Sequence, residues 1–192
     1  MLCRAGATQY ERSYSFGLHD GRLRELIHLY KYSGMRPLAR VFGEWMAEAY
    51  PRGESFDALV PVPLHWWKRL RRGFNQSDLL ARELSRRTGM PVLHAARRRR
   101  NTSSQAGLTN AQRRDNVRGA FSVPQPGVVR GKSLLLIDDV MTTGSTVNAC
   151  AAALRRAGAA RVSVLTLARA ARHSDARILS ASTHGLARGV SA

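Results

Sequence analysis

Two adjacent carboxylates and a run of hydroxyl groups stand together in one short stretch of this chain. Asp138 and Asp139 follow the apolar segment 133–137, and four hydroxyl residues with one glycine occupy 142–146. At the N-terminus of a helix, such a loop presents unpaired backbone N–H groups and the positive end of the helix dipole, so we expect it to hold a phosphate. The carboxylates would then accept hydrogen bonds from sugar hydroxyls or hold hydrated Mg²⁺.

The surrounding pattern predicts the elements that place this loop. Residues 133–137 form a predicted strand, 138–146 a polar loop, 147–157 an Ala-rich helix that ends at Gly158, and 162–168 a second strand. Strand, helix and strand at this spacing form a βαβ unit, which requires a parallel sheet. Ligands of such sheets bind beyond the carboxyl ends of the strands, where Asp138 is expected.

The rest of the chain adds helices and short strands. Apolar residues at helical spacing predict two helices within 20–50 and one at 76–88. Further strands are predicted at 58–64, 91–93 and 120–123.

Two basic segments follow predicted strands. The loop 65–73 emerges from the strand at 58–64, and its four cations fit a pyrophosphate, with a solvated basic turn as the alternative. These candidates are Lys68, Arg69, Arg71 and Arg72. The long polar segment 97–118 is typical of a lid that closes over a site and excludes water. Its lid candidates are Arg100, Thr102 and Gln105.

The charge of the chain narrows the class of partner. The 192 residues carry a formal net charge of +18 at pH 7. That charge favours a polyanionic partner: nucleic acid, a phosphorylated metabolite or an anionic membrane, with a general preference for arginine as the alternative explanation. No apolar run approaches the length of a membrane span, and Cys3 and Cys150 cannot form a disulfide framework. We therefore expect a soluble cytoplasmic protein without a secretory signal.

A P-loop nucleotide hydrolase is the alternative that the sequence excludes most clearly. The acidic strand end resembles a Walker B strand, and Gly131-Lys132-Ser133 ends like a Walker A loop. However, Pro126 stands where that loop needs its first glycine, and the segment leads into a strand instead of a helix.

Residues 134–146 resemble the phosphoribosyl pyrophosphate (PRPP) motif of type I phosphoribosyltransferases: an apolar strand, two acids, two variable residues and T-T-G-S-T. The resemblance implies that Asp138 and Asp139 contact the ribose hydroxyls as catalytic residues and hold Mg²⁺ through ribose or water. It also implies that the 5′-phosphate binds at Met141, Thr142, Thr143, Gly144, Ser145 and Thr146. Hypoxanthine-type members carry a third Asp at the position of Thr142, so a 6-oxopurine salvage enzyme is not expected.

Further motifs resemble the ComF/GntX branch of that family. They are L-Y-K-Y-S-G at 29–34, P-V-P-L at 61–64, R-R-G-F-N-Q at 71–76, T-x-x-Q-x-x-L at 102–108 and R-x-x-N-V-x-G-A-F at 113–121. Many members carry an N-terminal zinc module with four cysteines, but this chain has only Cys3 there. We therefore expect an N-terminal remnant without zinc at 1–19, a phosphoribosyltransferase-like domain at 20–171 and a disordered tail at 172–192.

The resemblance implies an α/β fold with a Rossmann-like parallel sheet, an N-terminal helical hood and a flexible basic lid loop. It implies Mg²⁺-dependent transfer of phosphoribosyl from PRPP to a nitrogen acceptor with release of pyrophosphate, linked to competence for DNA uptake. The alternative is a non-catalytic module that senses PRPP or a nucleotide and binds single-stranded DNA or a DNA-uptake protein. A homodimer remains an open option, a membrane partner is not expected, and no motif identifies the acceptor.

Overall fold

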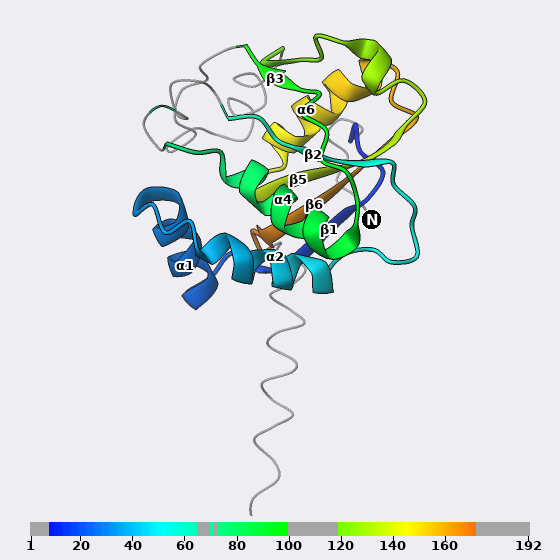
Figure 1. Ribbon diagram of the computed structural model, residues 1–192. Helices are drawn as coiled ribbons and strands as arrows, with labels where there is room; N and C mark the ends of the chain where they lie inside the picture. Colours follow the sequence, from blue (N-terminus) through cyan, green and yellow to red (C-terminus); the bar gives the residue numbers. More distant parts are fainter. Residues whose placement is uncertain (1–7, 65–69, 71–72, 100–118, 172–192) are drawn as a thin grey trace, which may run out of the picture.

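The central sheet contains four parallel strands within the part of the chain that the structure describes. A computed structural model describes residues 8–64, 70, 73–99 and 119–171. Within them the strand order is β1-β6-β5-β2, and every neighbouring pair runs parallel (Figure 1). The strands are β1 (Ser13–Leu18), β2 (Ala58–Pro61), β5 (Ser133–Met141) and β6 (Arg161–Arg169). Their carboxyl ends lie at one edge, and the predicted parallel α/β sheet is confirmed.

Helices cover both faces of this sheet. They are α1 (Gly21–Tyr32), α2 (Leu38–Glu48), α4 (Gln76–Thr88) and α6 (Ser145–Arg156), with a 3-10 helix at Pro126–Val128. Helices α1, α2 and α4 pack on one face and α6 on the other (Figure 1). The helices predicted within 20–50 and at 76–88 are confirmed, and we call α1 and α2 the hood.

Strand β5 belongs to two hydrophobic cores at once. Leu134 and Leu136 pack in the core that contains α6, whereas Leu135 and Ile137 pack in the core that contains α2 and α4. All four side chains are fully buried, and each contributes about 2 kcal/mol of hydrophobic stabilisation. A run that is apolar on both faces is what a parallel strand between two helical layers requires.

The boundary between β5 and α6 differs from the prediction. The sequence predicts a strand that ends at Ile137 and a helix that begins at residue 147, but β5 continues to Met141 and α6 begins at Ser145. The strand continues because β6 lies beside it, with Val140 opposite Ala168. The predicted loop therefore shortens to three residues, and both acids lie within the strand.

Strand β1 lies before residue 20, the predicted start of the domain. It pairs with β6 in parallel, so the sheet includes residues of the predicted N-terminal remnant. Its sequence, SYSFGL, has no apolar run because an edge strand has only one neighbour and is half exposed. Of the other predicted strands, 91–93 makes a single parallel bridge between Val92 and Leu59.

A separate two-stranded antiparallel ribbon lies outside the main sheet. It consists of β3 (Arg97–Arg98) and β4 (Phe121–Ser122), so the strand predicted at 120–123 joins this ribbon. The ribbon brackets the predicted lid segment, whose residues 100–118 lie outside the described ranges, as does the predicted tail. Over the described part of the chain, none of the helices has the length and apolar character needed to cross a membrane.

Candidate functional site

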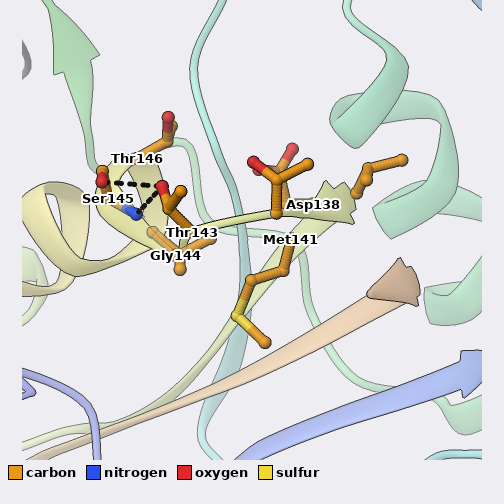
Figure 2. Close-up of a pocket in the computed structure, with 9 residues that line it drawn as sticks. Asp138, Met141, Thr143, Gly144, Ser145 and Thr146 are labelled. Carbon is orange, nitrogen blue, oxygen red and sulfur yellow. Dashed lines mark hydrogen bonds between the residues drawn. The ribbon is translucent and has the colours of Figure 1, made fainter. Parts of the chain in front are cut away.

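The predicted phosphate loop lines a pocket at the carboxyl end of β5. The pocket is small and therefore suits a compact group such as a phosphate. Its lining residues are Asp138, Val140, Met141, Thr142, Thr143, Gly144, Ser145, Thr146 and Val147. The structure thus brings together Asp138 and all six residues predicted to hold a 5′-phosphate (Figure 2).

The backbone of this loop is arranged for an anion. Gly144 has a φ of +76°, a left-handed conformation that lets α6 begin directly at Ser145. The first turn of α6 contains no acidic residue, so nothing in that turn neutralises the positive end of the helix dipole. The hydroxyl groups of Thr143 and Ser145 are 2.8 Å apart and form a hydrogen bond (Figure 2). The backbone N–H of Ser145 also donates a long 3.4 Å hydrogen bond to Oγ1 of Thr143, so the first N–H of α6 and two hydroxyl groups lie together at the pocket (Figure 2).

Met141 contributes differently from its neighbours in the loop. It lines the pocket, yet only 5% of the residue is exposed, and it belongs to the hydrophobic core that contains α6. In Figure 2 the side chain extends away from the hydroxyl groups of Thr143 and Ser145. Its backbone oxygen accepts a 2.9 Å hydrogen bond from the N–H of Ala170, so Met141 fixes the end of β5 beside the pocket.

The two acids project to different faces because they are consecutive residues of a strand. Asp138 faces the pocket and accepts a 2.9 Å hydrogen bond from the hydroxyl group of Ser77, near the start of α4. Asp139 is 8% exposed, and its Oδ1 lies 3.0 Å from Nζ of Lys31 on α1. The hood and α4 therefore each fix one carboxylate.

Burial makes the charge on Asp138 costly. Desolvation, followed by the charge on Asp139, raises the pKa of Asp138 to about 7, while the hydrogen bond from Ser77 and the charge on Lys31 oppose this shift. A ligand that donates hydrogen bonds to Asp138 would favour its ionised form. A sugar diol is such a ligand.

We expect Asp138→Asn to stabilise the unliganded protein above neutral pH. A group whose pKa is raised on folding contributes stability below about pH 4, its unfolded value, and loses it as the pH rises through about 7. Asparagine keeps an oxygen for Ser77 and carries no charge. Urea unfolding should show a variant advantage that is small at pH 4 and grows to at most about 4 kcal/mol by pH 8. A pH-independent difference would contradict the cost assigned to this charge.

Sequence reasoning assigned no role to Lys31 or Ser77. Lys31 belongs to the L-Y-K-Y-S-G segment and Ser77 directly follows R-R-G-F-N-Q, so both lie at motifs without revealing their contacts. Tyr30 connects the two regions, because its buried hydroxyl group donates a 3.0 Å hydrogen bond to the backbone oxygen of Gln76. The end of α1 and the start of α4 are thereby held together beside the acids.

The N-terminal segment also reaches the phosphate loop. The backbone N–H of Gln9 donates to Oδ1 of Asn148 on α6 at 2.7 Å. The hydroxyl group of Tyr10 donates a weak 3.9 Å hydrogen bond to the sulfur of Met141. Residues before the predicted domain start at residue 20 therefore support the loop.

The predicted pyrophosphate candidates Lys68, Arg69, Arg71 and Arg72 lie outside the described residues, as do the lid candidates Arg100, Thr102 and Gln105. The ends of both segments are described. The chain leaves β2 beside the acids, since Val62 donates to the backbone oxygen of Ile137 at 2.9 Å. The lid segment begins and ends at the β3–β4 ribbon, where Arg99 donates to the backbone oxygen of Ala120 at 2.8 Å.

The acid pair fits Mg²⁺ only as part of a complex with a ligand. Across the described ranges, no group of three or more His, Cys, Asp or Glu side chains could hold a metal ion. Asp138 and Asp139 supply two carboxylates, and Lys31 already contacts one of them. Mg²⁺ typically binds in this way, through one or two carboxylates together with water and substrate phosphates.

Comparison with protein families agrees with this geometry. A family model described as a phosphoribosyl transferase domain matches residues 36–181, and the chain therefore belongs to that family. A parallel sheet between helical layers, with the acidic strand leading into the loop 142–144 and a helix, is the type I phosphoribosyltransferase fold. Within the family, the chain is a ComF-family phosphoribosyltransferase-like protein, as its motifs indicated.

Individual relatives are similar over different shares of their length. Competence protein F of Haemophilus influenzae is 40% identical over 116 residues, which cover 59% of this chain and 51% of the relative. The DNA utilization protein YhgH of Salmonella typhimurium is 42% identical over 174 residues, or 87% of this chain and 76% of the relative. The chain thus spans about half the length of Competence protein F.

Among solved structures, the chain is similar to glutamine PRPP amidotransferase from B. subtilis. The identity is 24% and the TM-score 0.48, over 68% of this chain and 26% of the amidotransferase chain.

Proposed function

We propose that this protein binds PRPP and transfers its phosphoribosyl group to a nitrogen acceptor, with Mg²⁺ and with release of pyrophosphate. The observation that carries the proposal is the pocket in which Asp138 faces the N-terminus of α6 across the loop 142–144. The carboxylate of Asp138 can accept hydrogen bonds from sugar hydroxyls, and the predicted phosphate site lies in the same small pocket. This combination fits a sugar phosphate. Membership of the phosphoribosyl transferase family supports the same substrate class.

Each group of the chain has a distinct task in this proposal. The N–H groups of Ser145 and Thr146 and the loop hydroxyls would bind the 5′-phosphate, which anchors the ribose. Asp138 and Asp139 would accept hydrogen bonds from the ribose hydroxyls, and their negative charge would stabilise the cationic ribose that forms as pyrophosphate departs. Residues 68–72 would bind the pyrophosphate through their cations. Mg²⁺, bound together with the ligand, would neutralise charge on the leaving group.

A second function rests on charge and on the relatives. The net charge is +18, and two relatives carry the names Competence protein F and DNA utilization protein. We therefore retain as the alternative a non-catalytic module that senses PRPP or a nucleotide. Such a module would act in competence by binding single-stranded DNA or a DNA-uptake protein, mainly through phosphate contacts.

Two assays distinguish these functions. We expect release of pyrophosphate from PRPP in the presence of Mg²⁺ and at least one member of a panel of nucleobases and amines. A salt titration of single-stranded DNA binding runs beside it. No release across the panel, together with an affinity for DNA that falls steeply with salt, would contradict the enzyme and favour the module.

A further inference from the structure

An ion pair joins the hood to the acid pair. Nζ of Lys31 lies 3.0 Å from Oδ1 of Asp139, and the two side chains are only 19% and 12% exposed. Water and salt screen such a pair less than an ion pair at the surface, so its charge strongly affects the local potential. The charge on Lys31 also favours the ionised form of the neighbouring Asp138.

The position of Lys31 is fixed by the burial of its helix. Ile27 and Tyr30 are 1% and 0% exposed and attach the inner face of α1 to the core shared with α2 and α4. Tyr30 also donates its hydrogen bond to Gln76 at the start of α4. Lys31 follows directly in the last turn of α1, where the helix dipole favours a cation. The ammonium group is therefore held at Asp139 by the packing of the hood.

This placement solves an electrostatic problem of the proposed ligand. PRPP carries a phosphate and a pyrophosphate, and two adjacent carboxylates repel such an anion. We propose that Lys31 is a positioning residue of the PRPP site. Its charge neutralises Asp139, so that PRPP can approach the acid pair with less help from a divalent cation. The inference rests on the proposed function. It adds that a hood residue sets how strongly binding depends on Mg²⁺.

The test compares PRPP affinities by calorimetry with saturating Mg²⁺ and with a chelator. Lys31→Met leaves two uncompensated carboxylates, which repel PRPP but attract Mg²⁺. We therefore expect an affinity loss that is about tenfold larger with the chelator than with Mg²⁺. Lys31→Arg keeps the charge and should behave like the wild type. In an Asp139→Asn background, Lys31→Met leaves one uncompensated carboxylate instead of two, so its further loss with the chelator should be smaller than in the wild type.

Lys132→Met is the matched control. It removes the same charge from the other lysine among the described residues, directly before β5 and at the opposite end of the sheet. It should leave both affinities unchanged. A loss of PRPP affinity for Lys31→Met that is equal in both conditions, or no loss, would overturn the inference. PRPP binding by the wild-type protein would then still leave the proposed function standing. A wild-type protein that binds no PRPP in either condition would overturn both.

Discussion

Replacing both Asp138 and Asp139 by asparagine should weaken PRPP binding at least 100-fold. Hydrogen bonds to a charged group contribute about 1.5–3 kcal/mol each, and the substitution converts two charged acceptors to neutral ones. Their combined loss corresponds to at least two factors of ten, roughly 1.4 kcal/mol for each. Asparagine preserves the shape of both side chains and the contact of residue 138 with Ser77. Calorimetry with PRPP and Mg²⁺ measures the effect.

A charge-matched control separates this result from a general change in net charge. Glu25→Gln combined with Glu48→Gln also removes two carboxylates, within α1 and at the end of α2, where both residues are exposed. This control should bind PRPP like the wild type. Undiminished binding by the double asparagine variant would remove the acid pair from the site.

Valine at Gly144 should weaken PRPP binding at least 30-fold. A β-branched side chain at a φ of +76° costs more than the roughly 1–2 kcal/mol of an ordinary residue in this conformation. Its Cβ would also lie 3.4 Å from the hydroxyl oxygen of Tyr10 and 3.7 Å from the sulfur of Met141. The loop can relieve this strain only by turning the first N–H groups of α6 away from the pocket. The dissociation constants for PRPP and for ribose 5-phosphate should therefore rise together.

Gly89→Val supplies the control for backbone strain. Gly89 ends α4 with a φ of +72°, and a Cβ there would meet nothing within 4 Å. The variant should lose a similar amount of unfolding free energy and keep its affinity for PRPP. If both glycine variants lost affinity equally, the loss at Gly144 would reflect general destabilisation.

Much of the fold was predictable because its signals are local. The strand at 133–137 and the helix after it are encoded by one apolar run, one polar loop and one Ala-rich segment. Strand β1 was missed because its pairing with β6 joins residues about 150 positions apart, and its half-exposed edge needs no apolar run. The end of β5 was misplaced for the same reason, since β6 and not the local sequence extends it to Met141.

The candidate site likewise has one part that the local sequence encodes and another that depends on long-range contacts. The residues of the predicted phosphate loop are contiguous, so a pattern of residue types was enough to predict that they share one site, and they line one pocket. The contacts of the acids are long-range: Ser77 reaches Asp138 from α4, and Lys31 reaches Asp139 from α1. Residue types could not place those side chains, because hood packing and helix position determine which of them meet.

A crystal structure with PRPP and Mg²⁺ tests the central claim most directly. We expect the 5′-phosphate against the N–H groups of Ser145 and Thr146, and the ribose hydroxyls within hydrogen-bond distance of Asp138 or Asp139. The pyrophosphate should lie toward residues 68–72. A ligand that binds elsewhere on the chain, or a loop 142–146 that stays empty at saturating PRPP, would contradict the account.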